Sequence, residues 1–351
     1  MTYDPIPQDS RDLHEALSDL IVLRGGFALD DPHPAAEAMR HGHVPLQEIA
    51  ARLFRLPPGA PPGELSRALT HSDFGDALAT GLNRIISIGY GSAAQGFDTA
   101  CLDLPTKGLY PVQTPVLDLG ELSDDPTEAG RLVPIDVSEG ETVTPRIYGW
   151  KFLASRALLL GDGDAILAAW TAQMGGHCAR MVPRMIGAVL TTNAALADGT
   201  ALLTTSNTTS ATGLDLTALA EASAILRNAT TPVGNILGAR PGFLMVPPSK
   251  EMPARVLLAS MAKADDPPIR LLVNPWQPSD SYLLANTADA AVFGRVFPSA
   301  WGKAPRIERV SPSVRRPDGN LDYYDGQAFR AEIALGVQPI GRLGIVKIPA
   351  S

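Results

Sequence analysis

The chain has 351 residues, of which 45% are hydrophobic, and a formal net charge of −8, which is an ordinary globular composition. Its longest basic run is the pair Arg315-Arg316, which argues against a protein that grips nucleic acid by neutralising phosphates. Cys101 and Cys178 are too few and too widely spaced for a disulfide framework or a metal knuckle, which fits a reducing cytoplasm. Because there is neither a signal-peptide pattern nor an apolar run of about 18 residues, we expect a soluble protein that is not exported and has no membrane partner.

Three short amphipathic helices are predicted within residues 8–56. The first runs from a cap at Ser10 to Gly25, the second opens near Pro34 and the third opens at Pro45. Three such helices form only a marginal core, so we expect them to dock on another part of the protein.

A linker and a further helix follow. The stretch PPGAPPG at 57–63 combines stiffening prolines with turn-forming glycines and predicts a domain boundary. Beyond it, Ser72 is expected to cap a helix that ends between Gly89 and Gly91.

Residues 98–150 consist of short extended pieces separated by prolines, glycines and acidic clusters, which leave no room for a long helix. We predict a hairpin here, with a second turn at Ser138–Glu141. Its tip is expected to hold Glu121, Asp124, Asp125 and Glu128. Strands with so little apolar content cannot build a core of their own, so this arm should pack on a neighbouring molecule or be mobile.

The longest helix-compatible stretch is 162–193. Residues at steps of three or four predict one core-facing stripe. The stripe consists of Leu167, Trp170, Met174, Cys178, Met181, Met185 and Val189. Gly175, Gly176 and Pro183 disfavour a straight helix, so we expect it to lie against a sheet, to be bent or interrupted near Pro183, and to have glycines where another backbone comes close.

The remainder alternates helices and strands, which favours an α+β fold. Helices are predicted at 214–228 and, capped by Ser249, at 249–261; strands are predicted at 242–246, 269–273 and 282–285. The alternating stretches at 306–310 and 328–348 are candidates for the sheet that the long helix covers.

Metal sites have weak support in the sequence. His14, His33, His41 and His43 lie near one another in the chain, but they lack cysteines and a carboxylate at a fixed spacing. Gly161–Asp164 resembles half of a calcium loop or a phosphate turn, although the later ligand positions are apolar, so we expect it to cap the long helix.

Catalytic groups are equally hard to assemble. His177 and Cys178 are neighbours, and neighbours in a helix point about 100° apart, which is poor geometry for a nucleophile and its base. Ser206, Thr208 and Asp198 lie in a polar loop without a histidine. We therefore predict no catalytic, cofactor-binding or metal-binding residue, no cofactor and no enzymatic activity.

Five motifs in a fixed order resemble the major capsid proteins of tailed phages of the Hong Kong 97 type. The resemblance is greatest to the Mu-like prophage major head subunit and to the capsid half of prohead-protease/capsid fusion proteins. These motifs are His71–Phe74, Ser138–Thr142, Tyr148–Trp150, Ala195–Leu202 and Phe243–Pro248. The similarity extends from about 65 to 348, and Gln47–Arg52 also resembles a short motif that precedes the shell domain in relatives.

This resemblance implies a Hong Kong 97-type capsid fold with a small N-terminal helical unit. The implied divisions are the N-terminal unit at 1–56, the linker and N-arm with its helix at 57–107, the E-loop at 108–145, the P domain at 146–213 and 299–351, and the A domain at 214–298. The long helix would then be the spine of the P domain.

The implied function is mechanical. Such subunits assemble as pentamers and hexamers into an icosahedral head around double-stranded DNA, which they enclose without sequence-specific binding. Other implied partners are a portal, a scaffold or prohead protease, and decoration proteins; the implied location is the virion, after assembly in the bacterial cytoplasm.

Two departures from these relatives concern specific residues. Arg180–Arg184 stands where relatives have a polar Arg-x-Glu-Asn-Asp-like stretch, and Thr204–Asn207 stands where they have histidines, so no role of those histidines carries over. We expect no fused protease before the shell part of this chain.

Two alternatives remain open: an encapsulin-like nanocompartment shell and a soluble α+β enzyme with an unrecognised active site. The N-terminal unit is either a scaffold-like segment removed near 57–63 or a retained part of the subunit, and we favour retention.

Overall fold

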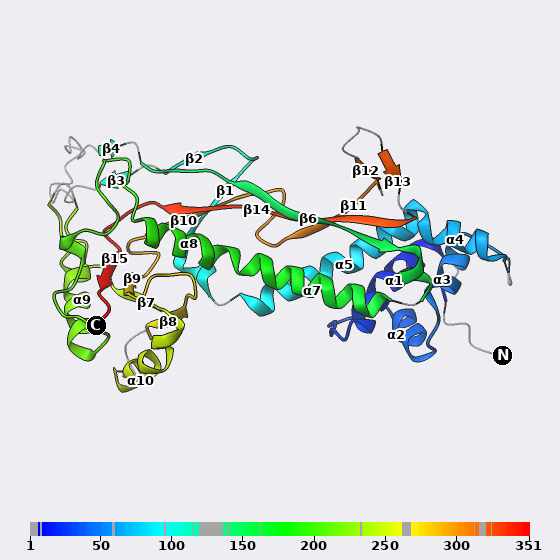
Figure 1. The fold of residues 1–351 in the computed structure, drawn as a ribbon, viewed down its shortest axis with the longest axis horizontal. Coiled ribbons are helices and arrows are strands. Elements are labelled where there is room, and N and C mark those ends of the chain that lie inside the picture. Colours follow the sequence, from blue (N-terminus) through cyan, green and yellow to red (C-terminus); the bar gives the residue numbers. More distant parts are fainter. Residues whose placement is uncertain are drawn as a thin grey trace, which may run out of the picture. The chain divides into compact units, whose positions relative to one another are not determined.

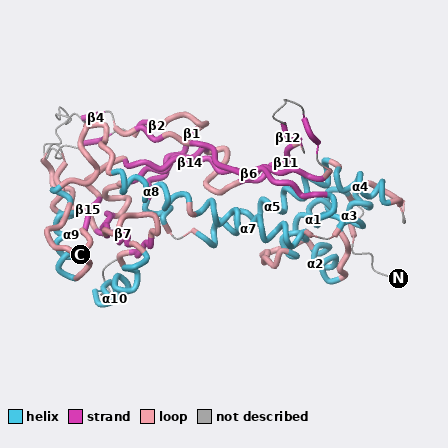
Figure 2. Tube along the Cα trace, in the orientation of Figure 1, coloured by secondary structure: helices cyan, strands magenta, loops and turns pink. Residues whose placement is uncertain are grey.

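The computed structural model places the chain in two compact units. It describes all residues except 1–5, 8, 58–59, 95, 115, 119–135, 139, 162, 232–233, 262–267, 312, 316–320 and 324. Unit 1 comprises 1–93, 147–179 and 301–333, and unit 2 comprises 94–146, 180–300 and 334–351. Figure 1 traces both units along the chain, and Figure 2 separates their helices from their strands.

Unit 1 is mainly helical. Its helices are α1 (Ser10–Arg24), α2 (Pro34–His41), α3 (Leu46–Leu53), α4 (Pro62–Thr70), α5 (Ser72–Ala93), α6 (Arg156–Leu160) and α7 (Asp164–Ala179). Its strands are β6 (Arg146–Ser155), β11 (Arg306–Val310), β12 (Ser313–Arg315), β13 (Leu321–Tyr323) and the first part of β14 (Gly326–Pro339). β14 pairs with β6 and, antiparallel, with β11, while β12 and β13 form a separate hairpin.

The core of unit 1 forms where α5 lies side by side with α7 and α1 packs on both of them (Figure 1). Close approach of α5 and α7 depends on small residues: a Cβ atom added to Gly89 would collide with the Ala172 carbonyl, and one added to Gly175 would collide with the Ile86 carbonyl. The expected glycine contact is thus confirmed at Gly175. The helix that covers the sheet is α5, which packs on β11, whereas α7 packs on α5.

The predicted long helix is divided. α7 ends at Ala179 and α8 (Met181–Thr192) begins after Arg180, so the interruption falls three residues before Pro183. Pro183 therefore occupies the first turn of α8, where its missing N–H removes no helical hydrogen bond. The expectation of an interruption near this proline is confirmed.

The predicted core stripe was only partly right. Leu167 and Cys178 are buried, but Trp170 is 49% exposed and Met174 is only partly buried. The buried side of α7 instead carries Ala168, Thr171 and Gly175 together with Leu167 and Cys178. Helix contact through small residues explains the difference, because a tryptophan on that side would hold α5 away.

The N-terminal helices match the prediction closely. α1 is capped by Asp9, whose side chain accepts a hydrogen bond from the Arg11 N–H, so the predicted cap at Ser10 was one residue late. Other boundaries moved further. Pro62 already begins α4 inside the predicted linker, and α5 continues through Gly89 to Ala93. Residues 57–63 lie within unit 1, so the division into compact units differs from the boundary predicted there.

Unit 2 contains the larger number of strands. Its elements before residue 200 are η1 (Phe97–Ala100), β1 (Cys101–Thr106), β2 (Val112–Gln113), β3 (Val116–Asp118), β4 (Asp136–Ser138), β5 (Thr142–Val143) and α8. The later ones are η2 (Thr205–Asn207), α9 (Leu216–Arg227), β7 (Pro241–Val246), η3 (Pro248–Lys250), α10 (Glu251–Met261), β8 (Arg270–Val273), β9 (Ser281–Ala285), β10 (Phe293–Pro298), the end of β14 and β15 (Ile345–Ile348).

One sheet of unit 2 has the strand order β15-β9-β7-β8 and is covered by α9. Another part pairs β1 parallel to β10 and β10 antiparallel to the end of β14. The predicted elements from 214 onward are confirmed in type, although Ser249 lies in η3, before α10, and does not cap it. The sequence reading missed β10, which is buried along its whole length and therefore has no alternating pattern.

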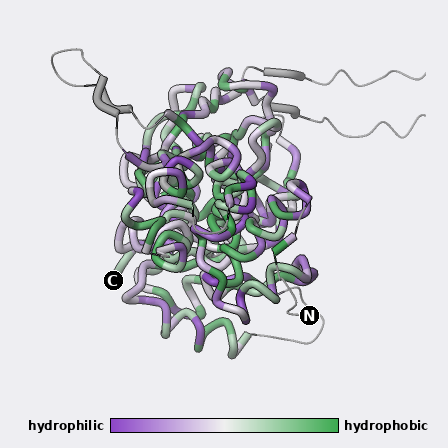
Figure 3. The backbone as a smooth tube through the Cα atoms, turned by 90° about the vertical axis from the view of Figure 1, so that its right-hand side faces the viewer, coloured by the Kyte–Doolittle hydropathy of each residue, from purple (hydrophilic) through white to green (hydrophobic). Residues whose placement is uncertain are grey.

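The mixture of helices and sheets confirms the predicted α+β class. Along the tube in Figure 3, hydrophobic and hydrophilic residues alternate within the helices, as expected for elements with one buried side.

Candidate functional site

The arrangement of His177 and Cys178 argues against a nucleophile. Cys178 is buried, and desolvation raises the pKa of its thiol to about 12, so the reactive thiolate is disfavoured at neutral pH. His177 is exposed and packs edge-on against Trp150, with ring centroids 6.4 Å apart. The structure thus places His177 on the exposed side of α7 and Cys178 on its buried side.

The polar loop has structural partners. Thr204 and Asn207 form reciprocal capping hydrogen bonds around η2, and Thr208 Oγ1 donates to the Thr204 carbonyl at 2.7 Å. Asp198 forms an ion pair with Arg342. These contacts hold the loop in place.

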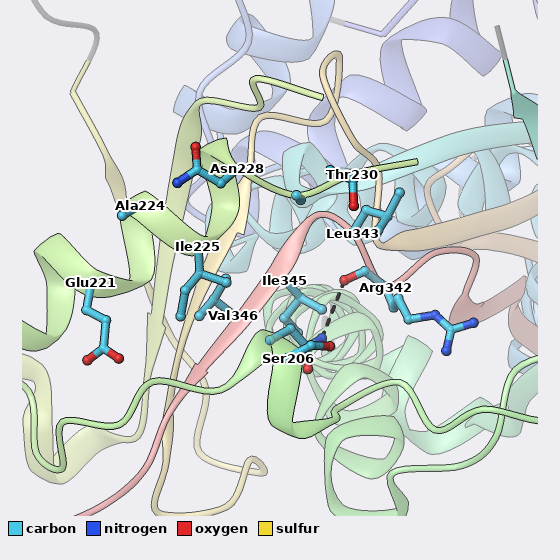
Figure 4. Close-up of a pocket in the computed structure, with 12 residues that line it drawn as sticks. Ser206, Glu221, Ala224, Ile225, Asn228, Thr230, Arg342, Leu343, Ile345 and Val346 are labelled. Atoms are coloured by element: carbon cyan, nitrogen blue, oxygen red, sulfur yellow. Dashed lines mark hydrogen bonds between the residues drawn. The ribbon is translucent and has the colours of Figure 1, made fainter. Parts of the chain in front are cut away.

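A pocket of about 470 Å³ lies beside this loop in unit 2 (Figure 4). Ser206 lies at one side of it, the apolar side chains of Ile225 and Leu343 line it, and the Glu221 carboxylate accepts hydrogen bonds from Ser210 and Ala211. The acidic side chain of this pocket is thus held by the neighbouring loop.

The predicted metal candidates are also separated. His33 caps α2 by accepting a hydrogen bond from the Ala35 N–H, and His14 contacts the Asp73 carbonyl at 2.7 Å. Asp164 begins α7 and forms an ion pair with Arg24 at 3.0 Å, which is consistent with a helix terminus more than with a calcium loop. Among the described residues there is no group of three or more metal-ligating side chains.

The arm is the first feature that is suited to contact with another molecule. β2 pairs antiparallel with β5, and β3 pairs antiparallel with β4, so the described strands of the arm form two short ladders with one outgoing and one returning side. The second turn predicted at Ser138–Glu141 includes Glu139, which lies outside the described residues; β4 and β5, on either side of it, pair with β3 and β2. The predicted acidic tip, Glu121 to Glu128, lies outside the described residues.

The base of this arm is packed within unit 2. Val143 is fully buried and the Thr114 N–H donates to the Glu141 carbonyl at 2.9 Å, while Leu109 and Tyr110 are 43% and 74% exposed. A two-stranded ribbon is marginally stable on its own in water. Its construction therefore fits a segment that another molecule supports.

The second feature is an exposed apolar face on unit 1. It consists of Trp150 on β6 with Ile166 and Trp170 on α7, each between 43% and 50% exposed. Trp150 packs against His177, which lies on the same side of α7 as Ile166 and Trp170. We call this set the aromatic face. Large side chains of this kind are enriched in protein interfaces. The sequence reading had placed Trp170 in the core and missed Trp150; the small residues opposite them on α7 were the signal that could have revealed the exposed side.

A family model described as phage capsid protein matches residues 139–348, which is more than half of the chain. The chain belongs to the phage capsid protein family. This capsid protein is a structural subunit of a shell, and shells are built from copies of their subunits. No curated protein matches its sequence.

Several solved structures resemble this capsid protein at low sequence identity. A virus-like particle from Pyrococcus furiosus is 15% identical, with 76% of this chain and 97% of that chain covered and a TM-score of 0.44. The corresponding values are 12%, 74%, 91% and 0.45 for Microbacterium phage Oxtober96, and 9%, 74%, 92% and 0.44 for the capsid of Myoviridae phage XM1.

Among the described residues of this capsid protein, every helix is too short or too polar to cross a membrane.

Proposed function

We propose that this capsid protein is the major head subunit of a tailed phage or prophage of the Hong Kong 97 type. In this proposal it assembles as pentamers and hexamers into an icosahedral shell that encloses double-stranded DNA. The observation that carries the proposal is the arm: two short antiparallel ladders beyond a packed base suit a subunit that laps over its neighbour. Contacts between different patches of successive copies close into rings, as a shell requires.

The aromatic face supplies the complementary surface. Trp150 and Trp170 expose 43% and 49% of their surface. Burial of this apolar surface by a second copy would stabilise the contact by about 25 cal/mol per Å² removed from water. Tryptophan is also among the residues that most often dominate binding energy at interfaces. We assign this face to contact with a neighbouring subunit.

The domain assignment follows the same reading. It places the E-loop at 108–145, the linker and N-arm at 57–107, the P domain at 146–213 and 299–351, the A domain at 214–298 and an N-terminal unit at 1–56. The Mu-like relationship, the virion location after assembly in the host cytoplasm, and a portal, scaffold, protease or decoration protein as helpers belong to this proposal.

The charge of the chain suits the containment of DNA. A net charge of −8 gives few sites for phosphate neutralisation, so the packaged genome would not be gripped in a salt-sensitive way. The interior would let DNA be packed and released.

Electron microscopy and sedimentation of the purified protein, expressed with its neighbouring phage genes, test the proposal. We expect closed icosahedral particles that carry a portal vertex and nuclease-protected DNA. Particles that lack a portal vertex and enclose protein cargo would indicate a nanocompartment. A monomer or dimer at high concentration in physiological salt, with assembly partners present, would contradict any shell role.

A further inference from the structure

The N-terminal helices α1–α3 contribute side chains to the hydrophobic core of unit 1. On α1, Leu17, Leu20 and Ile21 are fully buried, as are Leu46 and Ile49 on α3. They share one hydrophobic core with α5, α7 and residues of β11 and β14. A helix that only rested on the surface would leave the facing residues of both elements partly exposed. Here the facing residues of α1 and of α5 are buried together.

The backbones also approach too closely for a loosely attached segment. A Cβ atom added to Gly81 of α5 would come within 2.8 Å of the Ser18 carbonyl oxygen of α1. At the other end of α1, a Cβ atom added to Gly25 would come within 2.7 Å of the Ala168 Cβ of α7. Glycine at these positions allows α1 to fit between α5 and α7.

Two ion pairs join α1 to the rest of unit 1, one through an anionic and the other through a cationic side chain of α1. Asp19 of α1, with a side chain 4% exposed, pairs with Arg84 of α5, and Arg24 of α1 pairs with Asp164 of α7, whose side chain is 3% exposed. Removing α1 would thus deprive Asp164 of its cation and Arg84 of its anion. A buried carboxylate such as Asp164 that is left without its cation is strongly destabilising.

Two hydrogen bonds add to this attachment. His14 Nε2 lies 2.7 Å from the Asp73 carbonyl oxygen at the start of α5, and Gln47 Nε2 of α3 donates to the Leu160 carbonyl at 2.7 Å at the end of α6. Contacts therefore reach α5, α6 and α7 from two of the three N-terminal helices.

We propose that α1–α3 are a permanent part of the core of the capsid subunit and remain in the finished particle. They cover α5 and α7 from within the same chain, so this side of the helices is closed to neighbouring subunits. The segment is then a fixed part of the subunit in the finished shell and not a scaffold removed near 57–63. The part of this proposal that concerns particles rests on the proposed shell function.

The first test is the intact mass, under denaturing conditions, of subunits from purified DNA-filled particles. Full-length subunits are expected. A subunit that has lost the residues before the linker would overturn the inference while leaving the shell function intact. If no particles form at all, the shell function fails, and the second test still decides whether α1–α3 belong to the core.

The second test uses the position of the tryptophans. All four, Trp150, Trp170, Trp276 and Trp301, lie beyond residue 93, and three of them belong to unit 1, so tryptophan emission reports unfolding outside α1–α3. We expect Leu17→Ala in the full chain to lower the midpoint of the thermal emission change by about 5 °C or more.

The matched control is Glu15→Ala, an exposed position on the same helix, which should leave that midpoint within about 1 °C. If Leu17→Ala also leaves the tryptophan midpoint unchanged, while the helical signal shows α1 melting earlier, then α1 is a separable segment and the inference is wrong.

Discussion

Helix α1 and the arm at 108–145 depend on their surroundings in opposite ways. Nine residues of α1, Leu13 and the run 16–23, are buried within its own subunit, whereas at the base of the arm Val143 is buried and Leu109 and Tyr110 are 43% and 74% exposed. α1 obtains its stability from contacts that the chain itself provides. The described strands of the arm form two-stranded ladders, which are marginally stable alone in water, and in the proposed shell a neighbouring molecule would supply the missing stability.

One chain can thus both fold and assemble. Substitutions in elements that close the core should affect folding, and substitutions in elements that pair outside the core should affect assembly and leave folding nearly unchanged.

Shortening the arm should abolish assembly. Replacing residues 115–139 with a short Gly-Ser turn keeps β2 and β5 paired at the base but removes the outer part of the hairpin. We expect a folded subunit with unchanged tryptophan emission and no particles by electron microscopy.

A control for the arm replaces 119–135 with Gly and Ser at the original length, which separates loss of reach from loss of specific side chains. Particles that form normally from the shortened chain would show that the arm does not join subunits.

Breaking the ion pair between α1 and α7 should be the largest effect on folding. Asp164 is buried, so Arg24→Ala leaves an unpaired carboxylate and should lower the free energy of unfolding by about 3 kcal/mol. The control is Arg156→Ala in the same unit, because Arg156 and Asp325 are about half exposed and their pair should contribute about 1 kcal/mol at most. Urea titration followed by tryptophan emission measures both; equal losses would remove the distinction between core and surface.

The N-terminal helices show how much of this fold can be predicted from sequence. Gly25, Pro34 and Pro45 punctuate α1–α3 through local backbone geometry, and local signals of that kind survive into the structure. Their docking was also predictable, since three short amphipathic helices have apolar sides that must be covered. Which elements cover them depends on contacts between residues distant in sequence. The local pattern of prolines and glycines at 57–63 therefore could not show whether these helices form a separate domain.

The buried side of α7 marks the limit of such prediction. Spacing alone suggested that Trp170 faces the core, because a large apolar residue at a helical interval usually does. The contact with α5 selects small residues instead, and that selection is visible only when Gly89 and Gly175 are known to meet. The aromatic face could therefore have been recognised from sequence only by treating the small residues of α7 as its packed side.

Alkaline pH should destabilise the packed regions through their cysteines. Burial raises the pKa of Cys101 and of Cys178 from 9.0 to about 12, so above pH 9 the unfolded chain loses thiol protons that the folded chain retains. Stability from this source is fully present below pH 9 and declines as pH rises toward 12.

The cysteine prediction is checked by urea titrations at several alkaline pH values. Cys101→Ala/Cys178→Ala should flatten the dependence on pH, and in the unmodified protein an uncharged alkylating reagent at pH 8 should modify either thiol only after unfolding. The arm contains no cysteine, so its loss should leave this pH dependence unchanged. Rapid alkylation of the folded subunit would contradict the burial argument.

The smallest effect is expected at Glu221, a partly exposed side chain that has a defined local role. Its carboxylate accepts hydrogen bonds from the N–H and Oγ of Ser210, both at 2.8 Å, and from the Ala211 N–H at 3.1 Å, and these bonds lower its pKa. A lowered pKa contributes stability that is present above the unfolded value of 4.5 and is lost as pH falls through the folded value. Glu221→Gln keeps one acceptor oxygen and cannot titrate, so it should lower the thermal midpoint slightly at pH 7, and the difference from the unmodified protein should vanish in acid. A difference that persists at low pH would mean that the side chain acts through packing, as core residues do, and not through its charge.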